Sequence, residues 1–238
     1  MHRMPGVENT QGVKGFFDRW NIYHKIMRRN YLSHRQVYGI LRRFLLARFP
    51  EKKFSLSDLG CGDAEFMAKA LRGTGIGRYT GVDLSDIALI LAKKNMQGLP
   101  CSKRFVRRDF FKEITGERRA DVIWMSLTFH HLRLEQKRKF FVRCRKSLAR
   151  GGCLICYEPV LREGECRRDY LDRWLRYCGS HWKNLTKKEL LLCAKHIRKD
   201  DFPEKFSTYA RLAKQAGFGT ERCLYTSCIG TMKLMVFE

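Results

Sequence analysis

The sequence contains no uninterrupted apolar run near the roughly 18–20 residues that a membrane-spanning helix requires. Its first residues, Met-His-Arg-Met-Pro-Gly-Val-Glu-Asn, also lack the apolar centre of a secretory signal. Neither an internal repeat nor a low-complexity linker interrupts the chain. We therefore expect a soluble, cytoplasmic protein that has no membrane partner.

Paired metal-ligand spacing is missing as well, although the chain has 10 cysteines. Only Cys153 and Cys156 form a C-x-x-C pattern, and both fall within a predicted strand. Residues three apart on a strand point to opposite faces, so this pair cannot easily share a metal ion. We expect buried free thiols, as is usual in reducing cytosol, and no metal.

What the chain does have is enough apolar sequence for one sizeable core. Its 238 residues are 44% apolar, which fits a single α/β domain with added helices. Within it, Leu56 to Phe66 reads as an apolar strand that breaks at Gly60 and Gly62 and continues as a helix. Glycines allow the sharp bend, and the first amides of the helix can face an anionic group. The segment is typical of a nucleotide-cofactor turn.

Polar residues follow the next three predicted strands. Asp83 ends the second strand about twenty residues after the glycines, where a carboxylate can accept both ribose hydroxyls. Asp109 and Phe110 follow the third strand, where an adenine amino group could be read and its ring covered. His130 and His131 follow the fourth strand. Ligands of open α/β sheets bind at this carboxyl edge.

A dinucleotide-binding fold would need a third glycine three positions after Gly62. Glu65 stands there, and its side chain is hard to accommodate between helix and strand. The hydride-transfer interpretation is therefore disfavoured.

Five segments, taken in order, resemble the class I S-adenosylmethionine-dependent methyltransferases over nearly the whole chain. These segments are Asp58–Gly62, Gly81–Ser85, Arg108–Phe110, Ser126–Leu132 and Leu148–Gly152. Two departures are visible: Ala64 replaces a glycine found in many members, and Tyr23-His24 replaces Tyr-Asp. The second departure weakens any detailed transfer of roles to the amino-terminal helix.

The resemblance implies a doubly wound, mostly parallel seven-stranded sheet and S-adenosylmethionine as the cofactor. It assigns the cofactor contacts to Asp58, Gly60, Cys61, Gly62, Asp83, Leu84, Asp109, Phe110, Ser126 and Leu127. Tyr23 and Arg29 could close over the methionine end of the cofactor.

We predict one domain, residues 1–238, in four parts. Residues 12–50 form a helical cap, 54–158 the cofactor-binding core, 160–200 a helical insert that acts as a lid, and 203–238 a last helix and an antiparallel strand pair. The predicted core helices are Ala64–Leu71, Asp86–Asn95 and Leu134–Leu148. The final helix is expected from about Pro203 to Ala216, before strands at Glu221–Ser227 and Met232–Phe237.

Methyl transfer requires positioning and, for protonated acceptors, removal of a proton. His130 and His131 are the candidate bases, because a neutral imidazole suits that role near physiological pH; packing and cofactor contact is the alternative. Specificity should reside in the insert, whose aromatics and arginines suit a planar or anionic acceptor. The candidate acceptor contacts are His130, Tyr157, Glu158, Arg162, Trp182 and His196.

The formal net charge of +24 leaves an alternative open. Such a charge would serve phosphate binding, so transfer to tRNA or rRNA is the rival interpretation. However, the basic residues are spread along the chain, no appended RNA-binding motif is present, and no Asn-Pro-Pro-Tyr-like segment follows the fourth strand. We expect a small-molecule acceptor at an oxygen, nitrogen or sulfur atom. An inactive cofactor-binding partner subunit is a third interpretation.

Overall fold

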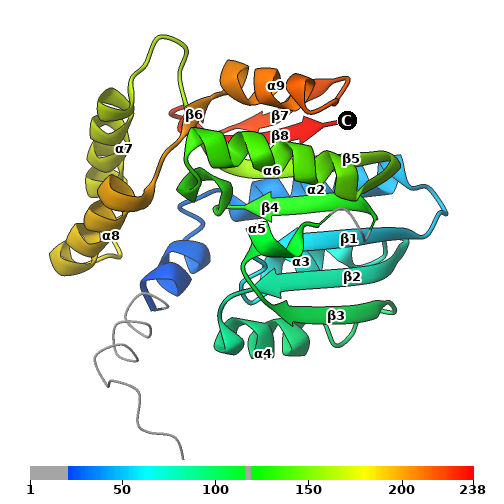
Figure 1. Ribbon diagram of the computed structural model, residues 1–238. Helices are drawn as coiled ribbons and strands as arrows, with labels where there is room; N and C mark the ends of the chain where they lie inside the picture. The colour runs from blue at the N-terminus through cyan, green and yellow to red at the C-terminus, as the bar shows by residue number, and fades with distance from the viewer. Residues whose placement is uncertain (1–20, 116–118) are drawn as a thin grey trace, which may run out of the picture.

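The computed structural model describes residues 21–115 and 119–238, and it is built around one twisted sheet (Figure 1). The order of the main strands is β3-β2-β1-β4-β5-β8-β7, and β8 runs antiparallel to both of its neighbours. The strands are β1 (Phe54–Leu59), β2 (Ile76–Asp83), β3 (Ser102–Arg107), β4 (Ala120–Ser126), β5 (Leu148–Leu161), β6 (Glu204–Lys205), β7 (Glu221–Thr226) and β8 (Met232–Phe237). The expected doubly wound, mostly parallel sheet is confirmed.

Helices cover both faces of the sheet. The core helices are α2 (His34–Arg48), α3 (Glu65–Leu71), α4 (Asp86–Asn95), α5 (Phe110–Glu113), α6 (Leu134–Ser147) and α9 (Phe206–Gln215). Apolar residues of α2, α3 and α4 join one hydrophobic core, and those of α6 and α9 join the other. Along β4, Trp124 faces the first core, while Ile123 and Met125 face the second. This alternation is the period of two that a strand buried on both sides requires.

Local capping fixes where several of these helices begin. The Ser85 hydroxyl accepts the N–H of Ala88 at the start of α4. Asp109 accepts the N–H groups of Phe111 and Lys112 and so starts α5. These side chains satisfy amides that have no partner within their own helix.

The insert stands beyond the carboxyl ends of β1–β4 as a pair of helices, α7 (Arg167–His181) and α8 (Lys187–Asp200) (Figure 1). A capping box between Thr186 and Glu189 starts α8. The insert has a hydrophobic core of its own, which Ile22 and Ile26 of the helical segment 21–28 complete. The amino-terminal segment and the insert are therefore packed together over the same edge of the sheet.

The structure corrects some expected boundaries. β5 is longer than its Gly-Gly start suggests, and its last residues pair in parallel with the two-residue strand β6, an eighth strand. Because Glu204 and Lys205 are used in that pairing, α9 begins at Phe206 instead of Pro203. Of the expected cap, residues 12–20 lie outside the described residues.

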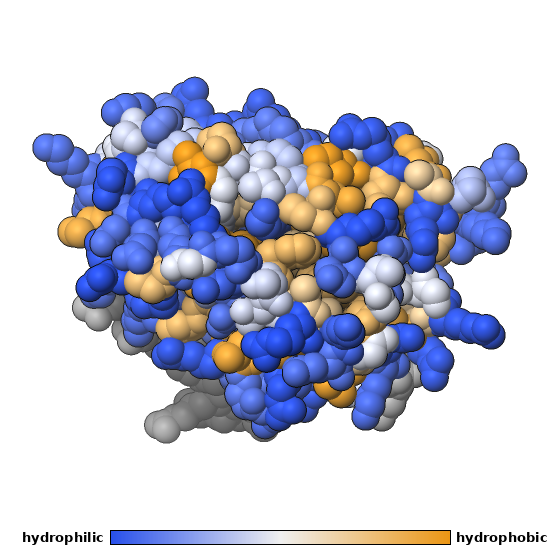
Figure 2. All heavy atoms as spheres, turned by 90° about the horizontal axis from the view of Figure 1, so that it is seen from above, coloured by the Kyte–Doolittle hydropathy of each residue, from blue (hydrophilic) through white to orange (hydrophobic). Residues whose placement is uncertain are grey.

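The cysteines form no disulfide, as expected, but burial of all ten was wrong. Cys166, Cys223 and Cys228 are exposed, while Cys61, Cys144, Cys153, Cys156 and Cys178 are buried. Across the part of the chain that the structure describes, no helix is both long and apolar enough to cross a bilayer. Figure 2 shows one face on which hydrophilic residues predominate and apolar ones lie between them.

Candidate active site

Two glycines with positive φ angles form the turn between β1 and α3. Gly60 and Gly62 have φ of 72° and 54°, in the left-handed region that favours glycine. A Cβ on Gly60 would lie 2.5 Å from Thr128 Oγ1, whereas a Cβ on Gly62 would meet nothing within 4 Å. Ala64, the N-cap of α3, also has a positive φ of 52°. Although alanine replaces the glycine found in many family members, the backbone there has the left-handed conformation that glycine favours. The turn therefore presents open backbone to a ligand.

Asp83 is tied to this turn from the end of β2. Its Oδ2 accepts the N–H of Gly62 at 2.9 Å, and its Oδ1 accepts the N–H of Ser85 at 2.9 Å. The next side chain, Leu84, is 64% exposed. A carboxylate and an uncovered apolar side chain thus lie next to one another beside the glycine turn.

Asp58, at the end of β1, is buried beneath the turn. The Tyr79 hydroxyl donates to its Oδ2 at 2.8 Å. Burial raises the pKa of Asp58 to about 7, against the effect of that hydrogen bond and with the help of the Asp83 charge. A carboxyl held this way ionises readily only when a positive charge lies close to it.

Tyr23 and Tyr38 cover the same point from the amino-terminal segments. Burial raises the pKa of Tyr23, and the charges of Asp63, Asp83 and Asp58 raise it further, so its phenol lies within electrostatic range of these carboxylates. Burial and the Asp58 charge likewise raise the pKa of Tyr38. In a chain of net charge +24, this is a local acidic site. It is suited to a cation that also carries hydroxyl groups.

The other predicted cofactor residues are more varied in position. Leu127 has a left-handed backbone, φ 53°, and its N–H donates to the Tyr157 carbonyl. Cys61 is buried behind the turn. Phe110 packs edge-on against Phe140. Arg29 is exposed.

The two imidazoles predicted as bases lie in the short helix η1 (Phe129–His131). Nδ1 of His130 is 2.6 Å from Glu158 Oε2, and its Nε2 is 3.5 Å from Asp201 Oδ1. Burial lowers the pKa of His131 to about 4, and the charge of His130 contributes to this. A base is most effective when its pKa lies near the working pH. A general-base role is therefore disfavoured, because both nitrogens of His130 face carboxylates and burial holds the pKa of His131 well below neutral pH.

Glu158 is a structural anchor where an acceptor contact was expected. It is fully buried, and its Oε1 accepts the N–H groups of Thr128 and Phe129, both at 3.0 Å. Burial raises the pKa of Glu158. The hydrogen bond from His130, the charge of His130 and the hydrogen bonds from the two amides lower it by more, so the pKa of Glu158 lies below its ordinary value. Glu158 thus fixes the loop after β4.

The remaining insert residues also differ from expectation. Tyr157 is fully buried and donates to the Leu32 carbonyl at 2.8 Å, so it cannot contact an acceptor. Trp182 is buried and stacks on Tyr31. Arg162 is exposed and donates to the Ile229 carbonyl in the turn before β8. The aromatic pattern of the insert reflects its own core, while His196, whose side chain is 54% exposed, stays accessible.

A cavity of about 420 Å³ lies where the segment 21–28 meets α8. Tyr23 lines it and lies within electrostatic range of Asp63, Asp83 and Asp58. Its lining residues are Ile22, Tyr23, Ile26, Leu192, Cys193, Lys195, His196, Lys199 and Asp200. Sequence reasoning missed most of these. The sequence feature that could have pointed to this cavity is the acidic pair Asp200-Asp201, which directly follows a strongly basic predicted helix.

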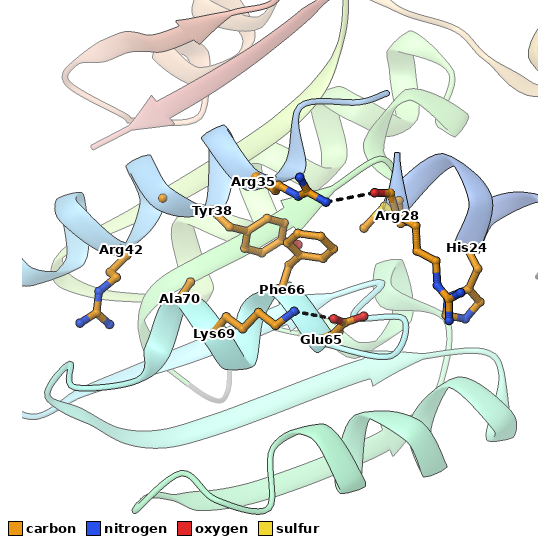
Figure 3. A pocket seen from close by; sticks show the side chains of 11 residues that line it. His24, Arg28, Arg35, Tyr38, Arg42, Glu65, Phe66, Lys69 and Ala70 are labelled. Atoms are coloured by element: carbon orange, nitrogen blue, oxygen red, sulfur yellow. Dashed lines mark hydrogen bonds and ion pairs between the residues drawn. The ribbon is translucent and has the colours of Figure 1, made fainter. Parts of the chain in front are cut away.

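A second hollow, of about 490 Å³, lies between α2 and α3 and is lined by cationic side chains over an aromatic floor (Figure 3). Tyr38 and Phe66 form that floor, with ring centroids 5.6 Å apart. Arg35 donates to the Arg28 carbonyl, and Lys69 pairs with Glu65 (Figure 3). We call it the cationic groove. It shares no lining residue with the cavity beside α8.

Comparison with known proteins agrees with this geometry. Residues 57–152 match the family described as "Methyltransferase domain". The alpha N-terminal protein methyltransferase 1 of Caenorhabditis elegans is 30% identical over 165 residues, covering 61% of this chain and 69% of that protein. The chain belongs to the class I S-adenosylmethionine-dependent methyltransferases.

Solved structures share the fold at lower identity. The plantazolicin methyltransferase BpumL, in complex with a monoazolic desmethylPZN analog and SAH, has a TM-score of 0.65 at 14% identity, covering 92% of this chain and 89% of that one. Human N-acetylserotonin methyltransferase in complex with SAM has a TM-score of 0.58 at 19% identity, covering 87% and 51%. The protein is an S-adenosylmethionine-dependent methyltransferase.

Proposed function

We propose that this methyltransferase acts on a small molecule that binds in the cavity between the segment 21–28 and α8. The observation that carries the proposal is that Tyr23 lines the cavity and also lies within electrostatic range of the carboxylates near the glycine turn. A volume of about 420 Å³ falls within the range of small-molecule sites. Methyl donor and acceptor would then meet at Tyr23.

The lining predicts the kind of acceptor. Ile22, Ile26 and Leu192 provide an apolar wall, and Lys195 and Lys199 carry positive charge at the rim. Such a site suits a molecule with an apolar or aromatic body and one anionic group. The acceptor class expected from sequence is retained, but its contacts shift from Tyr157, Trp182 and Glu158 to α8.

The cofactor contacts proposed for this chain follow the acidic site. Asp83 would accept the ribose hydroxyls, and Leu84 and Phe110 would cover the adenine, whose amino group Asp109 would accept. Asp58 and Tyr23 would face the methionine end and its positive charges. Positioning of the sulfonium methyl group against the acceptor is then the main catalytic contribution. Ser126 and Leu127 would shape the floor beneath it.

Transfer to RNA is the second candidate, and the cationic groove favours it. Arg28, Arg35, Arg42 and Lys69 line that groove, and aromatic rings lie beneath them. The groove shares no lining residue with the cavity at Tyr23, although a hollow of about 640 Å³ adjoins both of them through Arg28 and Ile22. We infer that RNA binds weakly, through phosphate charge, and without methylation.

We also propose a single methyltransferase domain, with the cap and the lid closing over one edge of the sheet. Ten cysteines without a disulfide support a reducing, cytoplasmic location.

The test is a mass-spectrometric screen for methyl transfer from labelled cofactor to a small-molecule extract, to total RNA and to peptides with free amino termini. Peptides are included because the C. elegans relative is an alpha N-terminal protein methyltransferase. Label in a small molecule, lost in a Lys195→Gln/Lys199→Gln variant that still binds cofactor, supports the proposal. Lys187→Gln/Lys188→Gln, at the exposed start of α8, is the matched control. A methylated nucleotide at a defined RNA position would reverse the ranking.

A further inference from the structure

Three potential metal ligands converge beside the proposed acceptor cavity. His130 and His131 come from η1 after β4, and Asp201 follows α8, some 70 residues later by its numbering. Asp201 Oδ1 lies 3.5 Å from His130 Nε2 and 3.7 Å from His131 Nδ1. One ligand atom from each of the three residues lies within 4.8 Å of the others. A single ion could contact all three after small side-chain adjustments.

One oxygen of the Asp201 carboxylate lacks a hydrogen-bond donor. Its side chain is only 7% exposed, and Oδ1 is buried without a hydrogen-bond partner among the residues that the structure describes. Leaving a buried carboxylate oxygen unpaired is costly, and such atoms are rare in folded proteins. The oxygen points instead toward two imidazole nitrogens at distances too long for a hydrogen bond. A cation between them would satisfy all three groups.

Glu158 fixes the ring of His130 for this purpose. Glu158 holds Nδ1 of His130 at 2.6 Å, so Nε2 is the nitrogen that faces Asp201. The Asp200 carbonyl lies 3.0 Å from Nδ1 of His131, the same nitrogen that faces Asp201, so a bound ion would replace this contact. Metal-binding histidines commonly have a carboxylate or backbone carbonyl on their other side. His130 with Glu158 reproduces that arrangement.

We propose that His130, His131 and Asp201 bind a divalent transition-metal ion of the zinc type through two nitrogens and one oxygen. Two imidazoles disfavour magnesium and calcium, which prefer oxygen ligands. Three protein ligands leave at least one coordination position for a water or a substrate. This assignment replaces our expectation, from cysteine spacing, that the protein has no metal.

If the proposed function is correct, the ion would lie next to the acceptor. The ring of His196, which lines the cavity, is 5.3 Å from that of His131. A metal-bound hydroxyl or thiol releases its proton more easily. The acceptor would then need neither imidazole as a base.

The experiment uses the full chain, treated with a chelator and titrated with Co²⁺ as a spectroscopic probe, followed by competition with Zn²⁺. We expect one Co²⁺ per chain, a visible d–d absorption band, and loss of that band when Zn²⁺ is added. Asp201→Asn and His131→Phe should each weaken binding by at least about tenfold. His181→Phe is the matched control, since His181 is exposed on α7 and should leave binding unchanged.

Two results would overturn the proposal. The first is the absence of one-to-one binding, or binding that neither variant weakens, which would leave His130 hydrogen-bonded to Glu158 alone. The second is a strong thiolate-to-cobalt charge-transfer band, which would assign the ion to cysteines. His131 is 36% exposed, so its replacement should leave the fold intact, as circular dichroism can check. Because no acceptor is needed, the result is independent of the proposed small-molecule substrate.

Discussion

The carboxylate of Asp83 and the backbone amide of Gly62 are joined by a hydrogen bond of 2.9 Å across the cofactor turn. The bond aligns the glycine turn with the end of the neighbouring strand before any ligand arrives. The same carboxylate is proposed to accept the ribose hydroxyls, so its Oδ2 serves both the turn and the ligand. Such preorganisation lowers the entropy that binding would otherwise cost.

Asp83→Ala should therefore lose S-adenosylmethionine affinity by at least about 100-fold, since two charge-assisted hydrogen bonds of about 1.5–3 kcal/mol each are removed. Calorimetric titration with S-adenosylhomocysteine measures this directly. Asp86→Ala is the control, because Asp86 lies nearby in an exposed pair with Arg107. Equal affinity in Asp83→Ala and wild type would remove Asp83 from the cofactor site.

The two glycines of the turn should respond differently to alanine. Gly60→Ala places a methyl group 2.5 Å from Thr128 Oγ1 at a positive φ, so we expect a loss of about 1–3 kcal/mol in unfolding free energy. Gly62→Ala meets no atom within 4 Å and should cost only about 1–2 kcal/mol of backbone strain. Its methyl group would, however, project into the proposed cofactor space. Urea unfolding combined with cofactor titration separates the effects: a stable Gly62→Ala with unchanged affinity would contradict the site.

The sequence predicted the sheet well, because strands and the turns that follow them are local features of the chain. The glycine turn, Asp83 and Asp109 follow recognisable strands, and α4 and β8 have the expected bounds. The insert was read less well. Its aromatics, such as Trp182, could equally line a pocket or fill a small core, and only packing against Tyr31 decides between the two.

Long-range pairing was not predictable either. Glu158 was expected at the acceptor, yet it binds the amides of the loop after β4. The approach of Asp201 to His130 joins segments that no local pattern connects. Periodicity and spacing report on neighbours along the chain, whereas these contacts depend on how the lid folds back on the sheet.

His34 should make the protein sensitive to acid. It is 1% exposed, and burial lowers its pKa to about 3. Between about pH 6.5 and pH 3 the unfolded chain binds a proton there that the folded chain does not, so stability falls as the pH falls, by about 1.4 kcal/mol per pH unit. His34→Phe should remove the contribution of one proton to the pH dependence of the unfolding free energy, while the phenyl ring can still stack on Tyr38. Urea unfolding at several pH values checks this, with His181→Phe as the control; an unchanged slope in His34→Phe would contradict it.

Asp58 should show the opposite dependence, because burial raises its folded pKa to about 7. Between about pH 4 and pH 7 the folded chain holds a proton that the unfolded chain has lost, so the contribution of this carboxyl to stability falls as the pH rises. Asp58→Asn removes the cost of ionisation while its amide oxygen can still accept the Tyr79 hydroxyl.

At pH 8, without ligand, Asp58→Asn should therefore be more stable than wild type, by on the order of a few kcal/mol. Its affinity for S-adenosylmethionine, which carries a sulfonium charge, should fall by at least about tenfold. Its affinity for S-adenosylhomocysteine, whose sulfur is uncharged, should fall less. In the wild type, binding below pH 7 should release a proton, which calorimetry in buffers of different ionisation enthalpy detects. A variant that is less stable at pH 8, or one that binds both ligands as the wild type does, would show that Asp58 supports the fold alone. In that case the acidic site would owe its preference for a cation to Asp63 and Asp83.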